Sequence, residues 1–237
     1  REEEQLRVLT GWAPAAIVVT GRHHTPGALR LLRDAQTRGI PVVEIWDHPT
    51  TRAESEGFAQ IGFDHFAVGG AMARHLLDLG HTSLAYVDSG VAEDFRAHER
   101  GEGFVAAVQA QGARATVLRA AMGDAFDAGR AVLPKILAAK GARVTAVAFA
   151  TDHLACGALM QATRQGIAIP GQLALLGFGD FPIGRQLEPT LSTVRPPTAD
   201  IGRVAAKAIL QSLADGPEPS SSKLPYQLIG RASTAAA

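Results

Sequence analysis

The sequence lacks several features that particular protein classes need. Its 237 residues include one cysteine, Cys156, so no disulfide can form within the chain, and a small buried hydrophobe is its expected role. Lysine plus arginine equals aspartate plus glutamate, at 23 each, which leaves no electrostatic footprint for nucleic acid. There is no apolar run of 18 residues and no signal peptide, so we expect a cytoplasmic chain that makes no membrane contact.

Motifs for catalysis and for cofactor or metal binding are missing or incomplete. No Gly-x-Ser-x-Gly turn is present, and Ser89 has no convincing base nearby in the sequence. The pair Gly177-x-Gly179 lacks a third glycine at the spacing of a dinucleotide-binding loop. Asp-His steps such as Asp152-His153 point neighbouring side chains apart, so they are not chelates. We therefore expect no catalysis, no cofactor and no metal.

What the chain does contain is an alternation of short apolar runs and helical patterns. Such alternation predicts an α/β fold of parallel sheets flanked by helices, with right-handed crossovers. The rhythm breaks near Pro189, and Gly216 to Ser222 is the most linker-like stretch. We expect strands over residues 16–20, 41–46, 59–63, 83–87, 115–118, 145–149, 173–178, 189–194 and 224–229. We expect helices over residues 1–10, 26–38, 67–79, 93–111, 125–139, 153–162 and 197–213.

The stretch from Thr145 to Met160 organises the rest of the chain. A buried strand over 145–149 runs into Asp152, and a helix with apolar positions at helical spacing follows. In open parallel sheets, ligands bind outside the carboxyl ends of the strands, where Asp152 is expected to lie. Asp152 therefore either accepts hydrogen bonds from a ligand or only caps the helix, and the two roles can coexist.

Two further carboxylates and one arginine join this candidate site. Asp180 and Asp64 also come just past expected strand ends, and Arg100 lies one helical turn before Phe104. A forked guanidinium supplies donors and two carboxylates supply acceptors, which suits the hydroxyls of a sugar. The alternative for Arg100 is an ordinary solvated arginine on the surface of a helix.

Glycines and aromatic residues near these positions have two interpretations. Gly101 and Gly103 each weaken the helix by roughly 1 kcal/mol relative to alanine, which indicates backbone packing, ligand approach or a helix that starts late. Phe66, Phe126 and Trp46 could stack on a ligand, although core packing is the more common role of such residues.

Additional cationic residues bear on the charge of the ligand. Arg96 and His98 lie in the same segment as Arg100, and Arg22-His23-His24 follows an early strand whose end should face a ligand. If these groups line the site, the ligand carries its own negative charge. In the alternative reading they point to water.

Six pieces of the sequence, taken in order, resemble the effector-binding core of the LacI-type bacterial transcription repressors. They are Gly80-His81-x-x-Leu84-Ala85-Tyr86, Arg100-x-x-Gly103-Phe104, Ala150-Thr151-Asp152-His153-Leu154-Ala155-x-Gly157, Gly177-Phe178-Gly179-Asp180, Pro189-x-Leu191-Ser192-Thr193-Val194 and Arg231-Ala232-Ser233-Thr234. A narrower resemblance, to the gluconate-operon repressors, comes from His23-His24-Thr25-Pro26 and Gly39-Ile40-Pro41-Val42-Val43-Glu44.

The resemblance implies a two-lobed, periplasmic-binding-protein-like (type I) fold with three crossings and a small effector in the cleft. The first lobe would comprise residues 1–88 and 195–215, lacking its first strand, and the second residues 89–194 and 216–237. The DNA-binding helix-turn-helix of the family is missing here, so we expect the native chain to extend upstream of Arg1. Operator DNA would be contacted only through that upstream domain.

The resemblance also implies roles for individual residues. Arg100 and Asp152 match the family's sugar-contacting arginine and aspartate, and Asp180 matches the second aspartate of a Gly-aromatic-Asp-Asp turn whose first aspartate is Gly179 here. The implied function is an effector-sensing core that binds a sugar or a gluconate-like sugar acid and performs no catalysis. The alternatives are an extracytoplasmic sugar-binding protein of a transporter with the same fold and, third, an enzyme.

A homodimer is expected as well. The helix expected over 67–79 carries more apolar residues than one buried face needs, which predicts a two-fold contact in which the first lobe takes part. These apolar residues are Val68, Met72, Leu76, Leu77 and Leu79.

Overall fold

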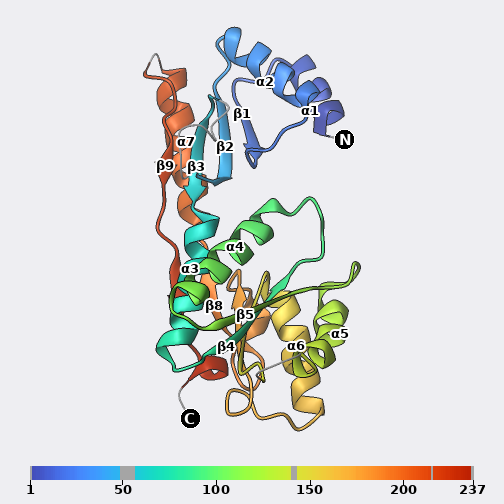
Figure 1. Ribbon diagram of the computed structural model, residues 1–237. Coiled ribbons are helices and arrows are strands. Elements are labelled where there is room, and N and C mark those ends of the chain that lie inside the picture. Colours follow the sequence, from blue (N-terminus) through green and yellow to red (C-terminus); the bar gives the residue numbers. More distant parts are fainter. Residues whose placement is uncertain (1, 49–56, 140–142, 215, 236–237) are drawn as a thin grey trace. The chain divides into compact units, whose positions relative to one another are not determined.

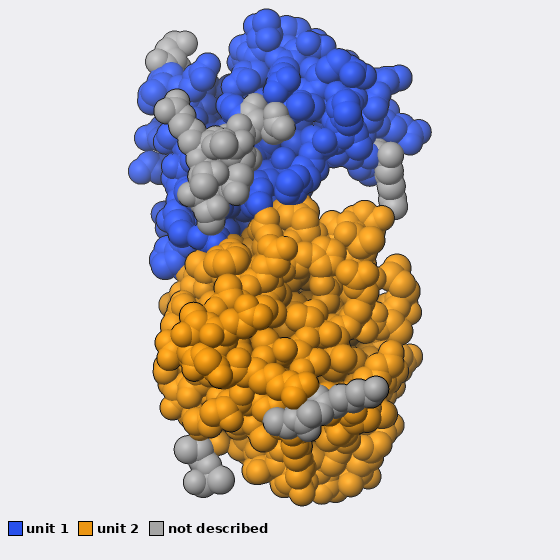
Figure 2. Space-filling model, viewed as in Figure 1, with its two compact units in different colours: residues 1–64, 197–225 blue, residues 65–196, 226–237 orange. Residues whose placement is uncertain are grey.

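The computed structural model describes residues 2–48, 57–139, 143–214 and 216–235, and its contacts divide the chain into two compact units (Figure 2). Unit 1 comprises Arg1–Asp64 and Pro197–Pro225, and unit 2 comprises His65–Pro196 and Tyr226–Ala237. The chain therefore passes three times from one unit to the other. Each unit has its own parallel sheet and its own helices, as the alternating sequence pattern predicts.

Unit 1 is built on a four-stranded parallel sheet in the order β1-β2-β3-β9. The sheet is covered on both faces, because Val42 packs in a cluster with α1 and α2 whereas its neighbour Val43 packs in a cluster with α7. Strands that are buried on both faces read as continuous apolar runs, which is the pattern seen in this half of the sequence. The strands are β1 (Ile17–Thr20), β2 (Val42–Asp47), β3 (Ala59–Phe63) and β9 (Ser222–Lys223), and the helices are α1 (Glu2–Gly11), α2 (Pro26–Thr37) and α7 (Thr198–Leu213).

Unit 2 is built on a six-stranded sheet in the order β10-β8-β7-β6-β4-β5, in which only β10 runs antiparallel. Helices α3 and α4 cover one face, and α5 and α6 cover the other (Figure 1). The strands are β4 (Ser83–Asp88), β5 (Arg114–Arg119), β6 (Ala146–Phe149), β7 (Ala174–Phe178), β8 (Ser192–Arg195) and β10 (Gln227–Ile229). The helices are α3 (His65–Asp78), α4 (Phe95–Ala110), α5 (Ala125–Leu137) and α6 (Asp152–Arg164), with short 3₁₀ turns at Pro182–Arg185 and Ala232–Thr234.

Glycines bring the helices of each pair into backbone contact. On α3, a Cβ at Gly69 would collide with the carbonyl of Arg100, and on α4 a Cβ at Gly103 would collide with the carbonyl of Phe66. The α5–α6 pair repeats this reciprocal arrangement: Gly129 faces the Leu154 carbonyl, and Gly157 faces the Phe126 carbonyl. The interpretation of Gly103 as a site of backbone packing is therefore confirmed.

The boundaries of the units differ from the lobe boundaries expected from the sequence. The first division falls at 64/65 instead of 88/89, because β4 is hydrogen-bonded to β5 and β6 and α3 packs on α4. The last division falls at 225/226 and splits the strand expected over 224–229. In its place, β9 pairs with β3 of unit 1 and β10 pairs with β8 of unit 2.

Candidate functional site

The candidate site lies at the carboxyl edge of the six-stranded sheet, by which we mean the ends of β4, β6, β7 and β8 and the residues that follow them. These four strands are parallel neighbours, so their carboxyl ends meet at one edge. Asp152 follows β6 and Asp180 follows β7, and Arg100 reaches the same edge from α4. Asp152 and Asp180 therefore follow strands of unit 2, as the sequence predicts, and the structure adds Arg100 to the same edge.

Arg100 is buried at this edge, with 3% of its surface exposed. Its Nη1 donates to His65 Nδ1 at 2.9 Å, and its Nη2 donates to the carbonyl of Ala150 at 3.0 Å. The guanidinium carbon lies 4.1 Å from the centre of the Phe178 ring, within the range of a cation–π contact. The reading of Arg100 as a solvated surface residue is therefore wrong.

The charge of Arg100 has no counter-charge beside it. An arginine side chain stays protonated in proteins, yet the groups that contact Arg100 are an imidazole, a carbonyl, an aromatic ring and the Tyr86 hydroxyl. Within the described residues, no carboxylate lies at ion-pair distance from this guanidinium, and its buried Nε makes no hydrogen bond. A buried guanidinium of this kind is ready to pair with an anion.

Asp152 is fully buried, and both of its carboxylate oxygens accept hydrogen bonds. Oδ1 accepts from the Thr193 hydroxyl at 2.6 Å, and Oδ2 accepts from the backbone N–H of Phe181 at 2.8 Å. Burial raises the pKa of the Asp152 carboxyl, although these two hydrogen bonds act in the opposite direction. The helix cap of α6 comes instead from Thr151, whose hydroxyl accepts from the N–H of Leu154, so Asp152 is not only a cap.

Asp180 is the centre of a cluster of arginines. Its Oδ1 accepts from Arg231, and its Oδ2 accepts from Arg195 Nε at 2.6 Å and from Arg185 Nη2 at 3.1 Å. Burial alone would raise the pKa of this carboxyl, but the hydrogen bonds from Arg231 and Arg195 outweigh burial and lower it. Asp180 therefore lies at the expected edge, but its oxygens already hold three cations.

The conformation of the turn between β7 and Asp180 explains why residue 179 is glycine here, where the family's turn has its first aspartate. Gly179 has φ 129°, a conformation that side chains rarely adopt, and a Cβ there would run into the Phe181 ring. An aspartate at this position would be strained in the conformation that the turn has here.

Three aromatic rings lie in sequence next to Asp152, the first pair tilted and the second stacked. The rings of Phe126 and His153 have centroids 5.1 Å apart, and those of His153 and Phe181 are stacked at 4.5 Å. Phe126 is half-buried and Phe181 is 41% exposed. Phe126 is thus brought to the expected edge by the N-terminus of α5, while its ring packs on histidine.

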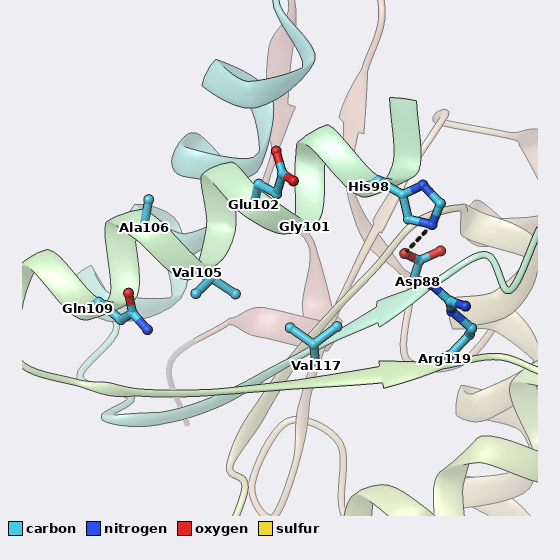
Figure 3. A pocket seen from close by; sticks show the side chains of 9 residues that line it. All are labelled: Asp88, His98, Gly101, Glu102, Val105, Ala106, Gln109, Val117 and Arg119. Carbon is cyan, nitrogen blue, oxygen red and sulfur yellow. Dashed lines mark ion pairs between the residues drawn. The ribbon is translucent and has the colours of Figure 1, made fainter. Parts of the chain in front are cut away.

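His98 lines a groove of about 670 Å³ between α4 and the edge strand β5 (Figure 3). Its Nε2 lies 3.1 Å from Asp88 Oδ2, so this candidate cation is paired with a carboxylate. Glu102 and Val105 from α4 and Val117 from β5 also line the groove.

The structure shows the following surroundings for three other candidates. The Arg96 guanidinium lies over the ring of its neighbour Phe95, at 4.9 Å. Phe66 is 45% exposed and contributes its carbonyl to the α3–α4 contact. His23 belongs to unit 1 and is exposed.

Two other residues expected near a ligand have partners inside unit 1. The ring of His24 lies 2.6 Å from Glu2 Oε1 and 3.1 Å from Glu44 Oε1, and the hydrogen bond with Glu44 is the largest reason why its pKa is raised. Asp64 accepts from Lys223 Nζ at 3.0 Å. Both ring nitrogens of His24 are therefore paired with glutamates of unit 1.

Several residues of the site were not assigned a role from sequence. Thr193 and Arg231 stand in motifs that carry the family resemblance, but only the structure shows that Thr193 holds Asp152 and that Arg231 holds Asp180. His65 stands in another of the Asp-His steps, Asp64-His65, a pattern that does not indicate an arginine partner. Phe178, which lies under the Arg100 guanidinium, read as a strand residue.

The described ranges lack two other kinds of feature. In them, no group of three or more histidine, cysteine, aspartate or glutamate side chains is arranged to hold a metal ion. None of the described helices has the length and apolarity needed to cross a membrane. Cys156 is buried as expected, and burial raises the pKa of its thiol to about 12.

Comparisons with known proteins agree with this architecture. The family described as "periplasmic binding protein-like domain" matches residues 73–234. The HTH-type transcriptional regulator GntR of Pseudomonas aeruginosa is 35% identical over 237 residues, covering 98% of this chain and 66% of that protein. GntR of Escherichia coli is 27% identical and is covered to 60% of its length. The chain thus spans less than two thirds of these curated relatives.

Solved structures give the same result. Transcription regulator GntR from Chromobacterium violaceum superposes with a TM-score of 0.84 at 30% identity, over 98% of this chain and 83% of that one. A LacI family transcriptional regulator from Silicibacter pomeroyi superposes with a TM-score of 0.84 at 28% identity, over 98% and 82%. These relatives are named as transcriptional regulators, not as enzymes. The chain belongs to the periplasmic binding protein-like domain family, in the form found in the ligand-binding cores of LacI-family regulators.

Proposed function

We propose that this chain is the effector-sensing core of a cytoplasmic LacI-type regulator, and that its effector is a sugar acid such as gluconate. The observation that carries the proposal is Arg100, a buried cation whose contacts are all neutral. An uncompensated buried charge is costly, and a carboxylate on the ligand would remove that cost through charge-assisted hydrogen bonds. The resemblance to the gluconate-operon repressors supports the same ligand class.

Asp152 would bind the hydroxyls of the effector. Each of its oxygens accepts one hydrogen bond within the protein, and an ionised carboxylate offers roughly four acceptor positions. Because Asp152 is fully buried, hydroxyl groups of a ligand would reach its oxygens when neighbouring side chains move aside, and Thr193 and the N–H of Phe181 could keep their hydrogen bonds. The arginine would thus recognise the acid group and the aspartate the polyol chain.

The regulatory role follows from the relatives of the chain. An effector that binds one conformation better than another shifts the population toward it, and this shift would control operator binding by an upstream domain. We propose that the protein acts on DNA as a homodimer through that domain, and that the present chain binds the effector and does not itself contact DNA.

The test is calorimetric titration of gluconate, phosphorylated gluconate and glucose at one ionic strength. We expect gluconate or its phosphorylated form to bind at least about tenfold more tightly than glucose, as a charged hydrogen-bond pair implies. Arg100→Met should abolish this preference, whereas Asp152→Asn should weaken the binding of acids and neutral sugar alike. Equal binding of glucose and both acids by the wild-type chain would contradict the proposal of an acidic effector.

A further inference from the structure

The contact between Arg100 and His65 has a fixed direction. Arginine only donates hydrogen bonds, so the His65 Nδ1 that lies 2.9 Å from Arg100 Nη1 must be the acceptor. A ring nitrogen accepts only when it carries no proton, so the neutral ring has its proton on Nε2. The partner of Arg100 is thus a neutral acceptor with a defined tautomer.

His65 holds one end of the guanidinium while two other groups hold the rest. The Ala150 carbonyl accepts from Nη2, and the face of the Phe178 ring supports the guanidinium plane. Together these contacts set the tilt and the rotation of the plane. Nε is buried and makes no hydrogen bond in the described part of the chain.

His65 is itself held rigidly. It is the first residue of α3, it is 2% exposed, and its ring lies 6.3 Å from that of Phe178. Its helix touches α4 through the backbone contacts of Gly69 with Arg100 and of Gly103 with Phe66. The distance from His65 to Arg100 is therefore fixed by main chain, and a contact arranged in advance lowers the ordering cost of binding.

We propose that His65 is a positioning residue that selects for anionic effectors, an inference that rests on the function proposed above. Its neutral Nδ1 orients the Arg100 guanidinium without neutralising it. A carboxylate at this position would orient the arginine equally well but would cancel its charge, so the site would then favour neutral sugars. Because the acceptor at residue 65 is neutral, the full positive charge of Arg100 can interact with an anionic group of the ligand.

Three variants separate orientation from charge. His65→Asn keeps an acceptor near the position of Nδ1, His65→Leu removes the acceptor at similar volume, and His65→Asp keeps the acceptor but adds a negative charge. By titration calorimetry we expect His65→Asn to bind gluconate within about threefold of wild type and His65→Leu about tenfold more weakly. His65→Asp should lose about tenfold for gluconate while its affinity for glucose holds or rises. In an Arg100→Met background, His65→Leu and His65→Asn should bind equally.

A second measurement needs no effector. In the ligand-free chain at pH 8, ¹⁵N NMR of His65 should show an unprotonated Nδ1 and a protonated Nε2, and Arg100→Met should change this tautomer balance. A protonated Nδ1, or equal gluconate binding by His65→Leu and His65→Asn, would overturn the inference. If no sugar or acid binds the wild-type chain while the tautomer is as expected, the proposed effector fails and the His65–Arg100 contact stands.

Discussion

At the scale of single residues, Asp180 shows how one side chain joins distant segments. It has φ 51°, a left-handed conformation that aspartate and asparagine tolerate better than other non-glycine residues. Its carboxylate binds Arg185 from the 3₁₀ turn after it, Arg195 at the end of β8, and Arg231 near the end of the described chain. The motif aspartate of this turn therefore connects three parts of unit 2.

We predict that Asp180→Asn lowers the free energy of unfolding by about 3 kcal/mol. Removing one partner of a buried ion pair leaves the others without compensation, and the side chain of Asp180 is 3% exposed. Asparagine tolerates the same backbone conformation, so the change isolates the charge. Urea unfolding measures the difference, and Asp127→Asn is the matched control, since Asp127 pairs with Arg130 at a side-chain exposure of 70%. The control should change stability by less than about 1 kcal/mol.

The same variant predicts a pH dependence. The pKa of Asp180 is lowered in the folded chain, because its bonds to Arg231 and Arg195 outweigh the opposing effect of burial. Its contribution to stability is therefore complete above the ordinary aspartate pKa of about 4 and is lost as the pH falls through the lower folded value. The stability gap between wild type and Asp180→Asn should narrow on acidification. A gap that widened toward acid pH would contradict this assignment.

At the scale of elements, the order of helices and strands was predictable and their partners were less so. Hydrophobic periodicity is local, so all the principal helices and most strands lie where it predicts them. The sheet to which a strand belongs depends on distant partners: β4 lies in unit 2 because of its bonds to β5 and β6. For the same reason, the roles of His65 and Thr193 could not be predicted from the sequence, because their partners Arg100 and Asp152 are 35 and 41 residues away.

The glycine contact between α3 and α4 gives a prediction at this scale. Gly103→Ala should lower the free energy of unfolding by roughly 1–3 kcal/mol, because the new methyl group collides with the Phe66 carbonyl in a packed contact. It should also weaken effector binding, since α4 carries Arg100. Gly202→Ala is the control, as Gly202 lies in α7 with nothing within 4 Å of the added Cβ. There the gain in helix propensity should raise stability by about 1 kcal/mol, as measured by chemical denaturation.

At the scale of the whole molecule, the apolar residues of α3 do not account for a dimer in the way that the sequence predicts. The apolar residues Val68, Met72 and Leu76 of α3 are fully buried and are not available to a partner, whereas Leu79, just after the helix, is 37% exposed. Unit 1 instead exposes apolar side chains at helical spacing on α1 and on α7. These are Val8, Leu9 and Trp12 on and just after α1, and Leu210 and Leu213 on α7.

We predict a homodimer whose contact includes the exposed apolar residues on and just after α1. Light scattering at tens of micromolar should give twice the chain mass for the wild type, and the pair Leu9→Glu with Trp12→Glu should shift it toward the monomer. Val117→Glu is the matched control, because Val117 and Leu9 are each 55% exposed and Val117 lies on β5 of unit 2. A wild-type monomer, or equal dissociation by the control, would rule out this contact.

The backbone contacts of the paired helices have a consequence for how such a sensor can change its ligand. Arg100 meets Gly69 through its carbonyl and meets the carboxyl edge through its guanidinium. The carbonyl is the same whichever side chain residue 100 carries. A substitution at this position can therefore change the group that binds the effector without changing the distance between α3 and α4. Ligand preference can therefore drift by substitution at this position while the scaffold keeps its dimensions, which makes residue 100 and its neighbour in space, residue 65, natural targets for redesign.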